Sequence, residues 1–133
     1  MREYARQQTA LLLVRMTLAL QRAARDGDAD SIHDVRVAMR RLSRCLRVFA
    51  QFYPHGAAKK IRRRISALMA LAGEARDCDI SIELVKGSGV VRRTAMAAQL
   101  AGRRVETGRA LLLEIRRWKR RDYLRQWRQR LEL

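Results

Sequence analysis

Apolar side chains recur every three or four positions along most of this chain, which is the spacing of amphipathic helices. The segment from 32 to 53 shows this most clearly. Its apolar stripe consists of Val35, Met39, Leu42, Leu46 and Phe49. One proline and seven glycines in 133 residues, with almost no alternation of β-branched residues, argue against strands. The pattern predicts an all-α protein.

Three short breaks interrupt this pattern, at 26–31, 53–56 and 87–89. The predicted helices lie near 3–25, 32–53, 57–86 and 90–131, and the last is expected to break near 119–122, where the apolar periodicity lapses. Ser31 is expected to cap the second helix, with Asp34 three residues later as a weaker capping box. Four amphipathic helices joined by short loops predict a single domain over residues 1–133, an antiparallel up-down-up-down four-helix bundle.

The same spacing predicts which side chains of the other helices face the core. For the first helix they are Leu11, Val14 and Leu18; for the third, Ile61, Ile65, Leu68, Ala72 and Ala75; for the last, Val105, Leu112, Ile115, Leu124 and Trp127. Trp118 and Trp127 are both expected to anchor packing. Cys45 and Cys78 are expected to be small buried hydrophobes.

The charge of the chain indicates what kind of partner it binds. Thirty Lys and Arg against 13 Asp and Glu leave a net charge of +17, and only four of the 30 cations are lysines. A GC-rich genome would also favour arginine over lysine, but it does not explain the positive excess. Self-repulsion of this size destabilises a compact protein unless an anion neutralises it. Because the arginine fork grips phosphate bidentately, we expect a polyanionic partner.

Several classes of protein are excluded by motifs that the sequence lacks. No run of 18 apolar residues predicts a membrane span, and the N-terminal segment carries Glu3 and has no small-residue cleavage site of a secretory signal. Two cysteines fit a reduced cytoplasm. There is no Walker glycine loop, no G-x-S-x-G, no H-E-x-x-H and no pair of catalytic carboxylates. We therefore expect binding rather than catalysis, without a cofactor or an intrinsic metal.

A stripe of basic side chains runs along the second predicted helix, opposite its apolar stripe. This basic stripe consists of His33, Arg36, Arg40, Arg44 and Arg47. Neighbours three or four apart stand about 5–6 Å from each other on a helix, so the stripe extends for about 20 Å. The alternative to a binding site is an ordinary solvated helix face, but such faces usually mix positive and negative charges, and this stripe contains no acid. The pattern favours a site for an extended anion, with His33 in the first turn, where free backbone N–H groups also attract negative charge.

Other charged residues leave more than one interpretation open. Asp79 continues the apolar stripe of the third helix and should be partly buried, and either Asp79 or Asp77 is expected to clamp an arginine or His33 of the second helix. A metal site is the alternative for Asp77 and Asp79, but positions two apart point about 200° away from each other on a helix, so they cannot chelate one ion. A further basic cluster offers either ligand contacts or an ordinary solvated face: Lys59, Lys60, Arg62, Arg63 and Arg64. A second cluster at 116–121 has the same two interpretations.

Two of these segments resemble the signatures of one known family. Residues 31–49 resemble the helix that names the CHAD family, the conserved-histidine α-helical domain, and residues 71–80 resemble its second signature, a Gly-x-x-Arg-Asp-x-Asp element on the next helix. The resemblance implies binding of inorganic polyphosphate by a basic surface and, in some members, association with polyphosphate granules. It implies ligand-side roles for His33, Arg36, Arg40, Arg41 and Arg44, supported by Arg76, Asp77 and Asp79.

The chain departs from that family in one respect. CHAD domains generally contain two four-helix halves, and this sequence has one histidine helix and one Arg-Asp-x-Asp element. Our hypothesis is that two copies form a symmetric homodimer that replaces the missing half, since two-fold association is the commonest oligomeric solution. A monomer with half of the groove, or a truncated relic, is the competing interpretation.

Three rival functions remain at this point. A charge of +17 attracts any polyanion, so nonspecific nucleic-acid binding is the first alternative, although no helix-turn-helix or RNA-binding motif supports it. A polyphosphate-processing enzyme that uses His33 is the second, and it lacks an identifiable nucleophile. A scaffold that recruits proteins to granules is the third. We expect a cytoplasmic polyphosphate-binding module.

Overall fold

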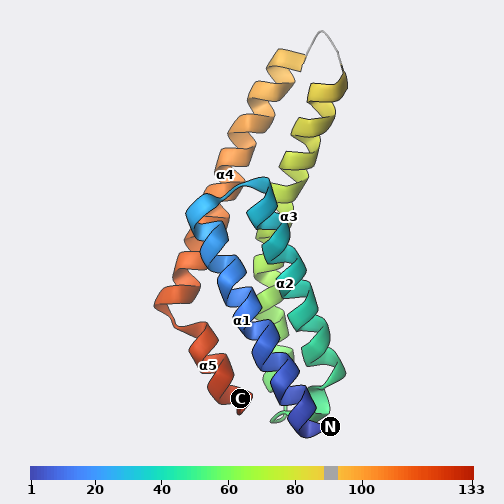
Figure 1. The fold of residues 1–133 in the computed structure, drawn as a ribbon. Helices are drawn as coiled ribbons and strands as arrows, with labels where there is room; N and C mark the ends of the chain where they lie inside the picture. The colour runs from blue at the N-terminus through green and yellow to red at the C-terminus, as the bar shows by residue number, and fades with distance from the viewer. Residues whose placement is uncertain (89–92) are drawn as a thin grey trace.

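All elements in the described part of the chain, residues 1–88 and 93–133, are helices in a computed structural model of this protein (Figure 1). They are α1 (Arg2–Asp26), α2 (Ala29–Val48), a single 3₁₀ turn η1 (Ala50–Phe52), α3 (Ala57–Ser88), α4 (Arg93–Arg120) and α5 (Tyr123–Arg130). The all-α prediction is confirmed for these residues. The expected break near 119–122 is also confirmed, because α4 ends at Arg120 and Asp122 adopts a left-handed backbone conformation with φ 53°.

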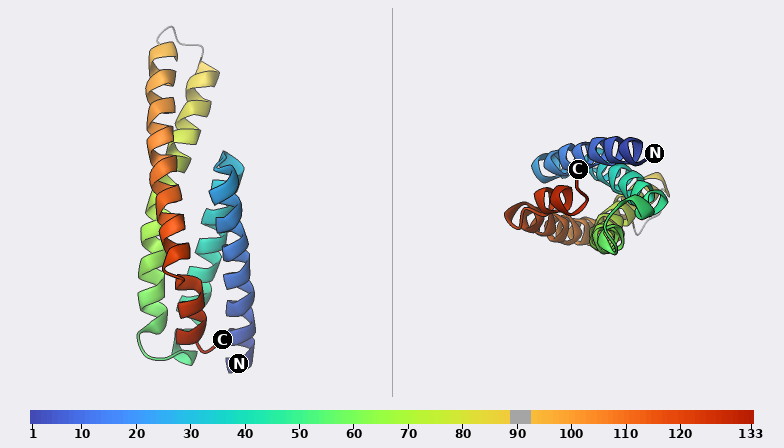
Figure 2. Two further views of the ribbon diagram at one scale, coloured as in Figure 1. Left: turned by 90° about the vertical axis from the view of Figure 1, so that its left-hand side faces the viewer. Right: turned by 90° about the horizontal axis from the view of Figure 1, so that it is seen from below.

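Consecutive helices run in opposite directions and pack against each other, α1 on α2, α2 on α3 and α3 on α4, and α5 continues in the direction of α4 (Figures 1 and 2). Helices α1 and α4 contact each other far less than α3 and α4 do. The upper parts of α3 and α4 extend past the turn between α1 and α2 as a projecting hairpin, because α3 and α4 are longer than α1 and α2. The predicted glycine turn at 87–89 falls partly outside the described residues, with α3 continuing through Ser88.

The core confirms the expected faces of α2 and α3. Val35, Met39, Leu42 and Leu46 are buried, with Phe49 packed partly against them. The α3 stripe is buried as well, at Ile61, Ile65, Leu68, Ala72 and Ala75. Cys45 and Cys78 are buried free thiols, and Trp118 and Trp127 pack edge-to-face with ring centroids 5.1 Å apart.

The expected inward face of α1 is wrong. Leu11, Val14 and Leu18 are 44%, 47% and 59% exposed, while Leu13 and Met16 of the same helix are buried. Residues 11–14 are all apolar, so the spacing alone fits more than one face, and packing against α2 selects the face with Leu13 and Met16. In α4 the expectation is only partly correct, because Ile115 is buried and Val105 is 59% exposed.

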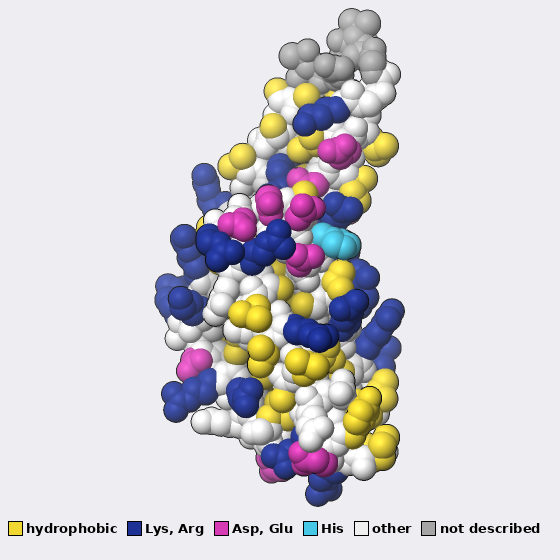
Figure 3. Space-filling model, in the orientation of Figure 1, with side chains coloured by type: hydrophobic (Ala, Val, Ile, Leu, Met, Phe, Trp, Pro, Cys, Tyr) yellow, Lys and Arg dark blue, Asp and Glu magenta, His cyan; other side chains and the backbone are white. Residues whose placement is uncertain are grey.

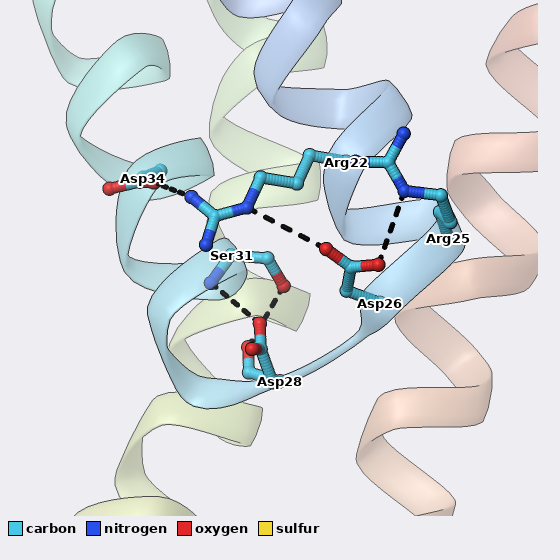
Figure 4. A network of polar contacts seen from close by, with 6 residues as sticks. All are labelled: Arg22, Arg25, Asp26, Asp28, Ser31 and Asp34. Carbon is cyan, nitrogen blue, oxygen red and sulfur yellow. Dashed lines mark hydrogen bonds and ion pairs between the residues drawn. The ribbon is translucent and has the colours of Figure 1, made fainter.

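The start of α2 also differs from the prediction. Asp28, not Ser31, is the N-cap: its carboxylate accepts a hydrogen bond from the Ser31 backbone N–H at 2.9 Å, and the buried Ser31 hydroxyl donates to the Asp28 carbonyl (Figure 4). Gly27, in the left-handed conformation at φ 63°, ends α1 and lets α2 begin earlier than expected. The backbone and side-chain hydrogen bonds from Ser31 lower the pKa of the Asp28 carboxyl.

Candidate anion-binding site

The basic stripe of α2 lies at the surface, opposite the buried apolar stripe. His33, Arg40, Arg44 and Arg47 are exposed, and Arg36 is half-buried. The two faces separate because an exposed guanidinium keeps its hydration while the apolar face of the same helix is buried against α1 and α3. The predicted division of this helix into an apolar and a cationic face is therefore confirmed.

The arginines of the stripe are not neutralised by carboxylates. Within the described ranges, the arginines in ion pairs are Arg6, Arg22, Arg25, Arg104 and Arg125. Asp34, the acid nearest in sequence to the stripe, pairs with Arg22 of α1 instead (Figure 4). The Nε of Arg36 is buried and has no hydrogen-bond partner in the structure. The stripe thus keeps its donors available for an external anion.

Three arginines of the stripe line one groove between α2 and α3. Arg40, Arg44 and Arg47 surround a space of about 280 Å³, together with two hydroxyl side chains, Ser43 of α2 and Ser66 of α3. The apolar residues of the groove are Met39, Ile65 and Met69. An anion in this groove would meet guanidinium N–H and hydroxyl donors, a combination that suits phosphate oxygens.

A partly buried ion pair joins Asp79, in the Gly73–Asp79 segment, to Arg104 of α4. The carboxylate of Asp79 accepts a hydrogen bond from Nε of Arg104 at 2.8 Å, and both side chains are 17% exposed. The same guanidinium donates through Nη2 to the Gly27 carbonyl at 2.7 Å. Asp79 is therefore partly buried and paired, as expected, but its predicted partner on the second helix is wrong: it pairs with α4. Helix α3 packs against both α2 and α4, and the partner of Asp79 is set by which of them lies on the Asp79 side of α3.

The family model of the CHAD domain matches residues 8–133. This chain belongs to the CHAD family. No curated protein and no solved structure matches the chain. Across the described residues, no helix of this CHAD domain is long and apolar enough to cross a membrane.

The remaining predicted ligand residues of this CHAD domain lie on other surfaces. Arg41 faces α1 in a separate hollow shared with Arg15 and Asp34. Three further predicted residues are exposed on α3 and do not line the groove: Lys59, Lys60 and Arg63. The guanidinium of Arg64 lies over the Tyr123 ring of α5, 4.0 Å from its centroid, and so packs against the C-terminal helix.

The supporting residues expected in the CHAD signature also lie in different surroundings. Arg76 is half-buried and lines a hollow of about 590 Å³ at the base of the projecting hairpin, beside Asp30, Glu83 and Lys86. Asp77 is exposed, and no ion pair or hydrogen bond of its side chain occurs among the described residues. No cluster of three metal-ligating side chains occurs in the part of the chain that the structure describes.

Sequence reasoning missed three residues of this CHAD domain, Ser43, Ser66 and Gly108, and it named Arg62 only as a member of a basic cluster. Ser43 and Ser66 line the groove, and Arg62 lies one turn from Ser66 on the same face of α3, half-buried, with an Nε that has no partner. Gly108 leaves room for the Arg104 side chain, since a Cβ at position 108 would stand 2.5 Å from Nη1 of that arginine. The serines carried no signal beyond their positions on the flank of each apolar stripe, and the sequence showed Arg62 only as one of the five cations between residues 59 and 64.

Proposed function

We propose that this CHAD domain binds inorganic polyphosphate along the groove between α2 and α3. One observation carries the proposal: Arg40, Arg44 and Arg47 line a single groove, and none of them is in an ion pair within the described residues. Membership of a family associated with polyphosphate binding in general supports it. We propose a binding function without turnover, because the groove contains no activated nucleophile beside a general base.

The physical basis is a linear array of charge-assisted hydrogen bonds. Successive arginines of the stripe stand about 5–6 Å apart, so several can engage one flexible phosphate chain at once. Each neutralised phosphate releases condensed counterions, as for nucleic acids, which makes the affinity depend steeply on salt. Longer chains should bind more tightly because they engage more of the stripe. His33 and the first turn of α2 would extend the same path toward the base of the hairpin.

The decisive experiment compares two double variants of equal net charge. Arg40→Gln with Arg44→Gln removes two cations from the groove, whereas Arg128→Gln with Arg130→Gln removes two exposed cations from α5. We expect the groove variant to weaken binding of long-chain polyphosphate by about 100-fold, two charge-assisted hydrogen bonds, and the α5 variant by a few-fold at most. Equal losses of polyphosphate affinity in the two variants would mean that binding follows net charge alone, without a localised site.

Nucleic-acid binding is the second candidate, because a charge of +17 favours any polyanion. The discriminating measurement is competition at equal phosphate concentration. We expect duplex DNA and single-stranded RNA to displace polyphosphate poorly, since the groove is lined by arginine and serine with no aromatic side chain for base stacking. Efficient displacement by either nucleic acid would favour the second candidate.

We further propose that two copies associate, and that the protein collects where polyphosphate collects, in cytoplasmic granules. The support for association is the outward face of α1, where Tyr4, Leu11, Val14 and Leu18 form an exposed apolar stripe (yellow over α1 in Figure 3). Light scattering tests it: we expect about twice the chain mass of 15.4 kDa in the presence of polyphosphate, and Leu11→Gln with Leu18→Gln should restore the monomer mass. A monomer mass for the wild type both with and without polyphosphate would contradict association.

A further inference from the structure

Gly73 lies in the middle of α3, on the flank that faces α2. It follows Ser66 and Met69, which line the groove, and precedes Arg76, at intervals of three and four residues that keep all four on one side of the helix. Helix α2 runs antiparallel to α3, so Arg36, one turn before Arg40 on α2, lies in the direction of the later residues of α3. Beyond the groove, the next residues along these two helix faces are therefore Arg36 on α2 and Gly73 on α3, followed by Arg76, which lines the hollow at the base of the hairpin.

The protein's own packing does not require a glycine at this position. A Cβ built on Gly73 meets no atom within 4 Å apart from its own helix backbone and immediate neighbours, so alanine would fit without a clash. The backbone does not require it either, because the glycines with positive φ among the described residues are Gly27 and Gly56. Glycine in a helix interior is less stable than alanine, since it loses more backbone freedom on folding. The residue therefore costs stability without an internal benefit.

A bare helix backbone beside a row of unpaired guanidinium groups allows a ligand to approach closely. We infer that polyphosphate passes over Gly73, the point where its chain comes closest to α3, so that the ligand bridges Arg36 and Arg40 on one side and Arg76 on the other. This inference rests on the proposed function and deepens it. It extends the binding path from the 280 Å³ groove to the Gly73–Asp79 segment and makes Gly73 a positioning residue for the chain. The buried, unpartnered Nε of Arg36, one helical turn from Arg40, fits a site whose donors are completed by a ligand.

The test is a comparison of Gly73→Ala with Gly102→Ala. Gly102 is its matched control because it also lies inside a long helix, α4, and a Cβ there also meets nothing within 4 Å. We expect both variants to unfold at the same or a higher temperature than the wild type. We expect only Gly73→Ala to weaken long-chain polyphosphate binding, by about tenfold, the loss of one charge-assisted hydrogen bond. Nonspecific retention of duplex DNA, which follows the net charge, should be the same for all three proteins.

The outcomes separate the two levels of the proposal. If the wild type fails to bind polyphosphate, the proposed function is wrong and the role of Gly73 goes with it. If the wild type binds, the Arg40 and Arg44 double variant weakens binding, and Gly73→Ala binds like the wild type, the close approach at Gly73 is wrong while the function stands. A lower unfolding temperature for Gly73→Ala would also overturn the inference, because the fold itself would then need the glycine.

Discussion

Arg104 of α4 donates to Asp79 of α3 and to the carbonyl of Gly27, so one guanidinium connects the signature segment of α3, helix α4 and the turn before α2. Gly27 lies in the turn between α1 and α2, and α3 and α4 project past this turn (Figures 1 and 2). Acidic side chains gather around the same level, above a surface rich in Lys and Arg (Figure 3). The pair therefore holds the start of α2, and with it the first turn of the basic stripe, against α3 and α4.

Removing the arginine of this pair should destabilise the fold. Arg104→Met leaves the Asp79 carboxylate largely buried without its partner, and we expect a loss of about 2–3 kcal/mol in the free energy of unfolding, measured by urea denaturation. Arg103→Met, one position earlier and exposed, is the control and should change stability by less than about 0.5 kcal/mol. Similar effects of the two substitutions would show that the Asp79–Arg104 pair has no special weight.

Alanine should have opposite effects at two glycines of α4. At Gly102, where a Cβ meets open space, we expect a gain of about 0.5–1 kcal/mol from the reduced backbone entropy of the unfolded chain. At Gly108 a Cβ would lie 2.5 Å from Nη1 of Arg104 and displace it from Asp79, so we expect a net loss of stability. Thermal unfolding of the two single variants measures both signs. A gain at Gly108 equal to that at Gly102 would mean that Arg104 moves aside at no cost.

The cap of α2 predicts a defined response to acid. Because the hydrogen bonds from Ser31 hold the pKa of Asp28 below its ordinary 3.8, folding is favoured by the ionised carboxylate above that pH, and this contribution is lost as the pH falls through the lower pKa of the folded state. Asn also caps helices but does not titrate, so Asp28→Asn should be less stable than wild type at pH 6, and the difference should shrink as the pH falls below the lowered pKa of Asp28. Urea midpoints at several pH values provide the measurement. A constant difference between the two proteins would contradict the role of the Asp28 charge.

Salt dependence should report how many groove cations meet the ligand. For polyphosphate, the slope of log affinity against log salt concentration should become shallower by about two in Arg40→Gln with Arg44→Gln, because each neutralised phosphate contributes about one to the slope of a polyanion. The slope of the Arg128→Gln with Arg130→Gln control should stay near the wild-type value. Titrations at four salt concentrations are enough for the comparison. A parallel shift of the groove variant, with unchanged slope, would place its two arginines outside the contact.

Local patterns were a reliable guide wherever a helix has one continuous apolar stripe. In α2, Val35 and Met39 belong to a stripe that no other apolar stripe rivals, and both are buried. In α1 the four successive apolar residues 11–14 left the face ambiguous, and the predicted Leu11 is exposed while Leu13 is buried. The cap of α2 was predicted at Ser31 instead of Asp28 for a similar reason, since both are good cap residues and the conformation of Gly27 decides between them.

The candidate site shows the same division. The exposed cationic face of α2 follows from spacing alone, because the turn of a helix sets the angle between residues on it. Which cations share a groove depends on the neighbouring helix: Arg40 and Arg44 meet Ser66 of α3, whereas Arg41, next to Arg40 in sequence, faces α1. The partner of Asp79 was out of reach for the same reason.

Helical content, the order of the segments and the opposition of apolar and basic faces on α2 are properties of residues within a turn or two of each other, and the amino-acid order is enough to infer them. The pairing of Asp79 with Arg104, the choice of the inward face of α1 and the assembly of the α2–α3 groove join residues far apart in the chain. They depend on how side chains of different helices fill a common core, and packing of that kind is decided by the whole fold at once.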